Sequence, residues 1–157
     1  MRETLFNWLA FLRPETASLR GLDLFAGTGA LGFELASRGA RSVLMVERDA
    51  RLVAGLVALK QRLNASQIEI LAGDALAVVA RLAPAVFDIV FLDPPFDSDL
   101  LLPAIERVRT LLAPDGVLYA ESSVPIAPDQ ARNLGFEVLR AGQAGRVRFH
   151  LLLKDGS

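Results

Sequence analysis

The sequence contains no cysteine and a single histidine, His150. Without cysteine there is no disulfide framework, no thiolate nucleophile and no zinc or iron–sulfur site held by cysteine. His150 lies between Phe149 and Leu151, where a packed or surface side chain is more common than a metal ligand. Because no second histidine exists, a zinc site and Ser–His hydrolase chemistry have little support, and we expect no metal.

Long hydrophobic runs are also absent, although 52% of the 157 residues are hydrophobic. The apolar residues fall in short runs broken by Gly, Pro, Asp and Arg, and none reaches the length that spans a membrane. The start of the chain lacks the basic leader, apolar stretch and cleavage site of a secretory signal. We therefore expect a cytoplasmic protein without a membrane segment. Its length suits one domain, residues 1–157, whose first 20 residues form a helix and lead-in.

Neither sign of charge dominates, since the formal net charge is −1. A dedicated nucleic-acid-binding domain usually carries a clear positive excess, so charge alone does not predict RNA binding. Arg140, Arg146 and Arg148 cluster near the C-terminus. Such a cluster is more often a solvated strand face than a track for phosphates.

Apolar runs of strand length alternate with longer segments of helical period. This pattern predicts an α/β fold, with a mostly parallel seven-stranded sheet between layers of helices. The predicted strands are residues 22–26, 42–47, 68–71, 87–93, 116–121, 136–140 and 146–153. The predicted helices are residues 28–37, 50–62, 75–82, 99–112 and 127–133.

The last two predicted strands are joined by only five residues, 141–145. That connection is too short for a crossover helix, so the two strands should form an antiparallel hairpin. A parallel sheet that ends in an antiparallel hairpin strand departs from the six-stranded parallel dinucleotide fold. This is a first argument against an oxidoreductase.

Gly27 and Gly29 lie in the predicted turn between the first strand and the first helix of the sheet. Glycine there lets the backbone approach a ligand, and Glu47, about 20 residues later, is placed to accept hydrogen bonds from ribose hydroxyls. NAD-binding proteins share this pattern. Asp23 favours S-adenosylmethionine, because a carboxylate attracts its ammonium group and would repel a pyrophosphate. The alternative for Asp23 is a local turn or cap bond.

Asp74 follows the third predicted strand and opens a helix. Two interpretations of it stay open. Asp is a preferred N-cap residue and occurs at such positions without any further role. In a methyltransferase, Asp74 would instead bind the adenine amino group, while the backbone N–H of Ala75 meets a ring nitrogen.

Asp93, Pro94, Pro95 and Phe96 end the fourth predicted strand. Two successive prolines donate no hydrogen bonds, so the chain leaves the sheet with unpaired carbonyl groups. An exocyclic –NH₂ supplies two N–H groups, one for the Asp93 carboxylate and one for the Pro94 carbonyl, with Phe96 stacked on an extruded base. These four residues therefore predict methylation of an amine. The alternative is a rigid Pro-Pro turn capped by Asp, with Phe in the core.

With these motifs in place, the sequence resembles the Rossmann-like class I S-adenosylmethionine-dependent methyltransferases that carry a D-P-P-F motif. Within them it is similar to the bacterial RsmD-type enzymes, which methylate guanine N2 in small-subunit (16S) ribosomal RNA. The matching stretches are residues 2–9 (R-E-T-L-F-N-W-L), 22–39, 46–49 (V-E-R-D), 93–96 and 119–122. They are spread over nearly the whole chain.

The resemblance implies a transferase that acts in rRNA processing through rRNA methylation. It implies S-adenosylmethionine as cofactor, S-adenosylhomocysteine as product, no metal and a monomer that binds ribosomal RNA, as free RNA or within a 30S subunit or assembly intermediate. The catalytic residues it implies are Asp93, Pro94, Pro95 and Phe96. The cofactor-binding residues we expect are Asp23, Phe25, Gly27, Gly29, Glu47, Arg48, Asp74, Ala75 and Asp93.

Members of this family carry a basic segment before R-E-T-L-F-N-W-L, and this sequence starts almost at that motif. We therefore expect a lower affinity for RNA than the family's. The alternatives that stay open are methylation of adenine N6, of another base amine or of a protein glutamine, an NAD-dependent oxidoreductase, and a cofactor-binding module without catalysis.

Overall fold

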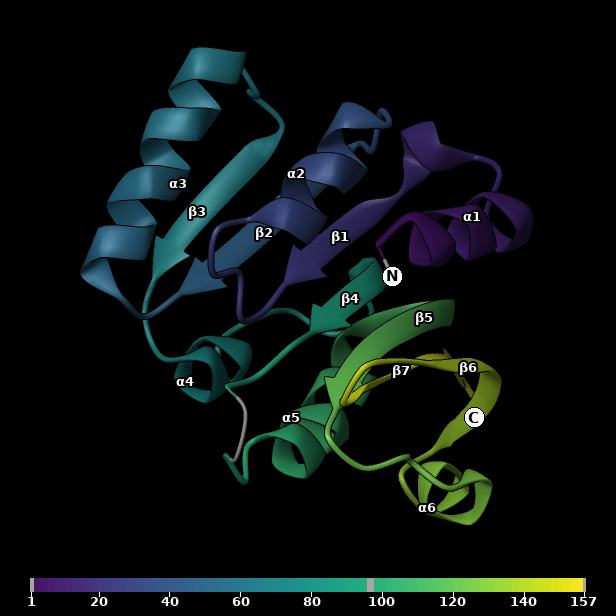
Figure 1. Ribbon diagram of the computed structural model, residues 1–157. Coiled ribbons are helices and arrows are strands. Elements are labelled where there is room, and N and C mark those ends of the chain that lie inside the picture. The colour runs from purple at the N-terminus through teal and green to yellow at the C-terminus, as the bar shows by residue number, and fades with distance from the viewer. Residues whose placement is uncertain (1, 96–97, 157) are drawn as a thin grey trace.

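In the computed structural model, residues 2–95 and 98–156 are described, and their strands form one seven-stranded sheet (Figure 1). The strands are β1 (Arg20–Asp23), β2 (Ser42–Glu47), β3 (Ile68–Ala72), β4 (Phe87–Leu92), β5 (Leu112–Ser122), β6 (Phe136–Ala144) and β7 (Val147–Lys154). The helices are α1 (Arg2–Leu12), α2 (Ala30–Ser37), α3 (Ala50–Leu63), α4 (Ala75–Val79), α5 (Leu101–Val108) and α6 (Pro128–Asn133). None of these helices is long and apolar enough to cross a membrane.

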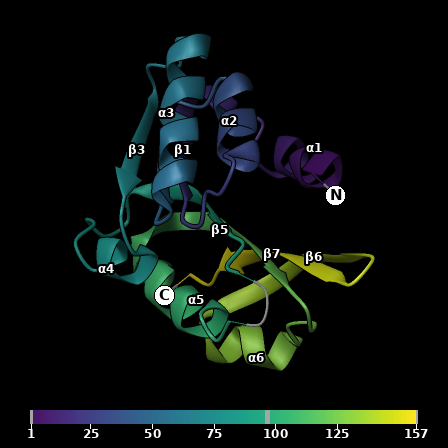
Figure 2. The ribbon, with the colours of Figure 1, turned by 60° about the vertical axis from the view of Figure 1, so that its left-hand side comes forward.

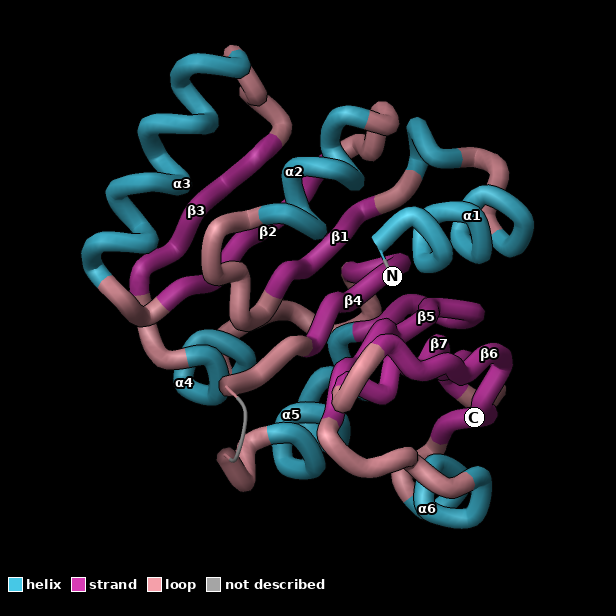
Figure 3. The backbone as a smooth tube through the Cα atoms, viewed as in Figure 1, coloured by secondary structure: helices cyan, strands magenta, loops and turns pink. Residues whose placement is uncertain are grey.

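The strand order is β3-β2-β1-β4-β5-β7-β6 (Figure 3). The pairs from β3 to β5 are parallel, and β7 runs antiparallel to both β5 and β6. This arrangement confirms the predicted α/β fold with a C-terminal antiparallel hairpin strand. The chain moves outward from β1 to β3 and then returns to the other side of β1 with β4. Ligands of open α/β sheets bind at the carboxyl ends of the strands beside such a switch in order.

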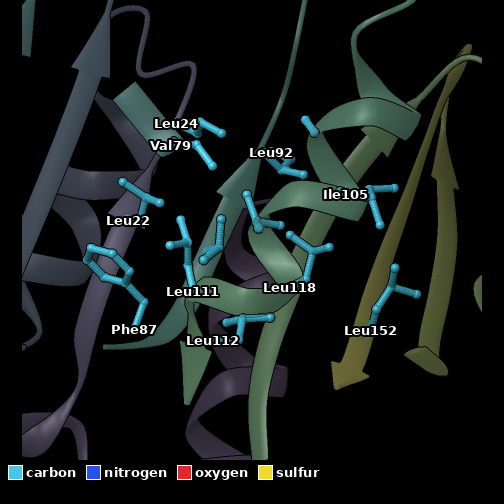
Figure 4. Packing of buried hydrophobic residues seen from close by; sticks show 14 of the residues in the cluster. Leu22, Leu24, Val79, Phe87, Leu92, Ile105, Leu111, Leu112, Leu118 and Leu152 are labelled. Atoms are coloured by element: carbon cyan, nitrogen blue, oxygen red, sulfur yellow. The ribbon is translucent and has the colours of Figure 1, made fainter. Parts of the chain in front are cut away.

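Helices lie on both faces of the sheet (Figure 2), and a hydrophobic core holds each layer of helices to it. Apolar residues of α4, α5 and α6 pack on one face, where the close-up shows Leu92, Leu118 and Leu152 of the sheet around Ile105 of α5 (Figure 4). Residues of α1, α2 and α3 pack on the other. Burial of each large aliphatic side chain contributes about 1.5–3 kcal/mol, so both layers fix the strand ends firmly.

The first strand and the helix after it are shorter than predicted. Residues 22–26 were expected in the strand and 28–37 in the helix, but β1 ends at Asp23 and α2 begins at Ala30. The residues between them form a turn, in which the Gly29 N–H donates to the Ala26 carbonyl at 2.8 Å. The N–H groups of Leu24 and Ala26 still donate to Phe91 of β4 and Val46 of β2, so the turn forms while the chain remains bonded to both neighbouring strands.

Other boundaries also differ from the prediction. Helices predicted at 75–82 and 99–112 are shorter, because each ends in tighter turns, with i→i+3 hydrogen bonds after α4 and a 3₁₀ segment at Arg109–Leu111 after α5. Strands predicted at 116–121 and 136–140 are longer. β6 pairs with β7 as far as Ala144, so the predicted loop 141–145 is mostly strand and the hairpin turns at Gly145 and Arg146.

Candidate active site

A cavity of about 890 Å³ opens at the carboxyl ends of the parallel strands. It lies at the switch in strand order, and its lining includes residues that follow β1, β2, β3 and β4. Acidic residues outnumber basic ones in this lining: Asp23, Glu47, Asp49, Asp74, Asp93 and Glu121 against Arg2 and Arg48. Such a wall attracts a ligand that carries positive charge and repels a pyrophosphate.

The two glycines of the first turn have different tasks. Gly27 lines the cavity, has a φ of 59°, and has open space where a Cβ would stand. Gly29 also has a positive φ, of 86°, but a Cβ there would come within 2.6 Å of Leu56 and Phe33. Gly29 is buried and is not among the lining residues. The structure therefore places Gly27 where backbone can meet a ligand, and Gly29 where the turn must pack closely.

Glu47 connects the turn after β1 to the turn after β2. One of its carboxylate oxygens accepts the Gly27 N–H at 2.8 Å, and the other accepts the N–H groups of Arg48 and Asp49, both at 2.8 Å. A carboxylate has about four acceptor positions, so about one is left for a ribose hydroxyl. Glu47 thus shapes the cavity as well as lining it, which sequence reasoning did not anticipate.

Asp23 is the most buried acidic residue at the site, with 4% of its surface exposed. Its Oδ2 accepts the N–H of Gly32 in α2 at 3.1 Å. Burial raises the pKa of Asp23 to about 7, and the nearby Asp93 and Glu47 carboxylates add to the rise. A cation bound at the cavity would lower this pKa and stabilise the charged form.

Asp74 caps α4, since its Oδ2 accepts the N–H of Ala77 at 3.1 Å. The capping interpretation is therefore confirmed. Asp74 and the first residue of α4, Ala75, also line the cavity, as do Phe25 and Arg48. The structure thus brings together every expected cofactor-binding residue except Gly29.

A second cavity of about 390 Å³ adjoins the first, and the two share Asp93, Pro95 and Glu121 in their walls. Pro94 lines only the second cavity. Desolvation by burial raises the pKa of Asp93. Phe96 lies outside the described residues, so its predicted stacking stays a prediction.

The two prolines after Asp93 differ in what their carbonyl groups do. The Pro95 carbonyl accepts both the N–H and the Oγ of Ser98, at 3.2 and 2.7 Å. No donor among the described residues reaches the Pro94 carbonyl. The Asp93 carboxylate and the Pro94 carbonyl therefore have no donor among the described residues, and the binding of an amine by this pair stays a prediction.

Glu121 is a site residue to which sequence reasoning assigned no role. It lies near the end of β5, next to β4 in the sheet, and lines both cavities. The Tyr119 hydroxyl donates to its Oε2 at 3.1 Å. Burial, and then the negative charge of Asp93, raise the pKa of Glu121 to about 7. The sequence signal was partial, because Glu121 is the last residue of a predicted strand, but only the strand order shows that this strand lies beside the one that carries Asp93.

His150 is a packed residue, as expected. It is 2% exposed, and its Nε2 accepts the N–H of Ile126 at 3.0 Å. Nδ1 must then carry the proton and donates to the Ala120 carbonyl at 3.2 Å. Burial lowers the pKa of His150. His150 therefore fixes the segment after β5, which lines the second cavity.

The residues of the larger cavity fit S-adenosylmethionine. Its ammonium and sulfonium groups are positive, which suits the excess of carboxylates, and the open space at Gly27 lets a ligand approach the turn. Asp23 and Gly27 would hold the methionine end, Glu47 the ribose, and Asp74 with Ala75 the adenine. The same wall disfavours the pyrophosphate of NAD.

Known proteins resemble the chain in sequence and in fold. Residues 1–153 match the family described as conserved hypothetical protein 95. The chain is 33% identical to ribosomal RNA small subunit methyltransferase D of Escherichia coli (strain K12), over 99% of this chain and 77% of that protein. It is 37% identical to the protein of the same name from Haemophilus influenzae, over 78% of this chain and 64% of that protein. The solved structure of yhhF from Escherichia coli superposes with a TM-score of 0.86 and 33% identity, covering 99% of this chain and 85% of that chain.

Proposed function

This chain belongs to the family described as conserved hypothetical protein 95, and we propose that it is an S-adenosylmethionine-dependent transferase that methylates the N2 amine of a guanine in small-subunit (16S) ribosomal RNA. One observation carries the proposal. Among the described residues no donor reaches the Asp93 carboxylate, which lines both adjoining cavities, or the Pro94 carbonyl, which follows it in the wall of the second cavity. The substrate class is supported by the relatives, which are named ribosomal RNA small subunit methyltransferase D.

The protein's own contribution is position and charge. When bound, S-adenosylmethionine supplies a methyl carbon that its sulfonium makes electrophilic, and it leaves as neutral S-adenosylhomocysteine. The Asp93 carboxylate and the Pro94 carbonyl accept the two N–H groups of the amine, which orients the nitrogen lone pair. As nitrogen gains positive charge, Asp93 stabilises it and can take the proton that the amine loses. No metal is needed for this chemistry.

Ribosomal RNA as a partner is supported by arginines near the second cavity. Arg148 pairs across the sheet with Ser122, which lines that cavity, and Arg146 lies in the adjacent hairpin turn. Neither arginine has an ion-pair partner among the described residues. Both are free to contact phosphates of a strand whose base enters the cavity. With an rRNA substrate we expect a cytoplasmic protein, and because one chain builds both cavities, we expect a monomer to be active.

The test is incubation of the protein with labelled S-adenosylmethionine and small-subunit ribosomal RNA, free or within 30S particles, followed by mass spectrometry of nucleosides. We expect N2-methylguanosine. Label only in N6-methyladenosine or in protein glutamine would replace the proposal by one of those activities, and no label with either substrate would contradict it.

Asp93→Ala tests the role of the Asp93 carboxylate in methyl transfer. We expect a fall in kcat of at least about 10²-fold, because this variant loses an acceptor for the amine and the charge that stabilises it. Because Asp93 also lines the cofactor cavity, calorimetry should show that the affinity for S-adenosylhomocysteine falls far less than kcat does. Glu69→Ala, which removes an exposed carboxylate of β3 outside both cavities, is the control. Undiminished methylation by Asp93→Ala would refute the role given to Asp93.

A further inference from the structure

Glu121 lies beside Asp93 at the carboxyl edge of the sheet. The last residues of β4 and β5 pair in register, Leu92 with Ala120, so Asp93 and Glu121 each follow the same pair. Both side chains line both cavities. A planar base whose amine is held by Asp93 therefore presents its neighbouring edge atoms toward Glu121.

The Glu121 carboxylate is held in one orientation. Its Oε2 accepts the hydroxyl of Tyr119, which is 1% exposed and packs edge-on against Phe91 with ring centroids 6.3 Å apart. No described residue is recorded as a donor to its Oε1. Above its pKa of about 7, Glu121 is ionised, and an ionised carboxylate accepts hydrogen bonds and donates none. Glu121 thus offers one fixed, unused acceptor next to the position of the amine.

Purine bases differ at the atom that would meet this acceptor. Guanine carries an N1–H donor adjacent to its N2 amine, whereas N1 of adenine, adjacent to its N6 amine, is an acceptor. We propose that Glu121 selects guanine, by accepting the N1–H at Oε1 while Asp93 and the Pro94 carbonyl hold the N2 amine. This inference rests on the proposed function, and it gives the guanine assignment a basis in this chain's own residues.

Selectivity arises because a base without an N1–H leaves an acceptor of the site without a donor. With guanine, the three acceptors meet three N–H groups. With adenine, the Oε1 of Glu121 faces the lone pair of adenine N1. Oε1 and N1 then both lose their hydrogen bonds to water without a replacement, which costs about 1–3 kcal/mol, or more for a charged group. Sites built around a hydrogen bond to the substrate reject analogues that lack it by large factors, up to about 10⁴–10⁵.

The wild-type protein can test this with two substrates that present the same amine. RNA with 2-aminopurine in place of the target guanine keeps the amine at C2 but has an acceptor at N1. We expect kcat/KM for the guanine RNA to exceed that for the 2-aminopurine RNA by at least about 10²-fold. Equal values would overturn the inference while the proposed function stands, and methylation of neither RNA would overturn both.

Glu121→Gln supplies the reciprocal test. The amide keeps the size of the side chain and adds an N–H donor that matches the N1 lone pair of 2-aminopurine. We expect the preference for guanine to fall at least about tenfold, with unchanged affinity for S-adenosylhomocysteine by calorimetry. Glu69→Gln, an exposed position of β3 outside both cavities, should keep the wild-type preference. If E121Q folds and also keeps the wild-type preference, Glu121 does not bind the N1–H of guanine. If E121Q does not fold, the wild-type rates with guanine RNA and 2-aminopurine RNA are the test.

Discussion

The two halves of the cavity wall use their carboxylates differently. At the ends of β1 and β2, where the cofactor is expected, Glu47 accepts three backbone N–H groups and Asp23 accepts one. At the ends of β4 and β5, where the target base is expected, Asp93 accepts none from the described residues and Glu121 accepts only the Tyr119 hydroxyl. The carboxylates of the cofactor side are therefore part of the folded framework, whereas those of the target side keep acceptor positions that no described residue uses.

This difference separates stability from activity. Removing a carboxylate that backbone N–H groups use leaves those groups without a partner, so it should weaken folding and binding together. Removing a free carboxylate relieves charge repulsion and costs only activity. Substitutions on each side show whether the distinction holds, and where it fails.

The largest combined effect is expected for Glu47→Ala. Three N–H groups of two turns lose their acceptor, and we expect the free energy of unfolding in urea to fall by roughly 2–3 kcal/mol. The affinity for S-adenosylhomocysteine should fall at least about tenfold, because the Gly27 turn that lines the cavity loses its support. Asp93→Ala is the matched variant and should unfold within about 0.5 kcal/mol of wild type. Equal destabilisation by the two variants would remove the distinction between the sides.

Asp23 should be an exception to this distinction, because its carboxylate is expected to destabilise the fold. Although it lies on the cofactor side, it is buried beside two other carboxylates. Its folded pKa, about 7, exceeds the unfolded value of about 3.9, so the folded state loses stability as pH rises from about 4 to 7.

Asp23→Asn removes this charge. We expect the free energy of unfolding to rise by roughly 1–3 kcal/mol at pH 8 and to change little at pH 4. Affinity for S-adenosylhomocysteine should fall nonetheless, because the ammonium group loses its counter-charge. Destabilisation at pH 8 would show that the Asp23 carboxylate is stabilised by contacts other than the Gly32 N–H.

A smaller effect is expected where the target side meets RNA. Arg146→Ala with Arg148→Ala should raise KM for RNA roughly tenfold at low salt and reduce the slope of log affinity against log salt by about 1.4, since two phosphate contacts are lost. Arg62→Ala is the control, because Arg62 lies in the last turn of α3, about 15 Å along the helix from Leu52, the last residue of α3 in the cavity lining. An unchanged slope in the double variant would return the arginines to the solvated strand face expected from the sequence.

The sequence predicted the sheet, its antiparallel hairpin and most of the cavity lining, because strand periodicity and turn residues are local signals. That Asp93 and Pro94 present acceptors without a backbone donor was predictable, because two prolines after a strand donate no hydrogen bonds. Glu47 as an acceptor for Gly27 was not, because that bond joins turns 20 residues apart. The role of Gly29 depends on Leu56 and Phe33, whose side chains approach the turn only in the folded chain. Glu121 required knowing that β5 lies beside β4.

The smallest expected effect concerns His150, which gives the target side a structural tie through Ile126. Its folded pKa is lowered by burial, so the unfolded chain, with a pKa of about 6.5, takes up the proton first as pH falls. The contribution is constant above about pH 6.5 and is lost below it, by up to about 1.4 kcal/mol at pH 5.5. Asp23 and Glu121 change the stability with pH in the opposite direction, because their pKa values are raised. Only the difference in stability between wild type and His150→Gln therefore isolates the contribution of His150. We expect that difference to shrink between pH 7.5 and 5.5 in urea unfolding, whereas a constant difference would mean that the imidazole keeps its bond to Ile126 at low pH.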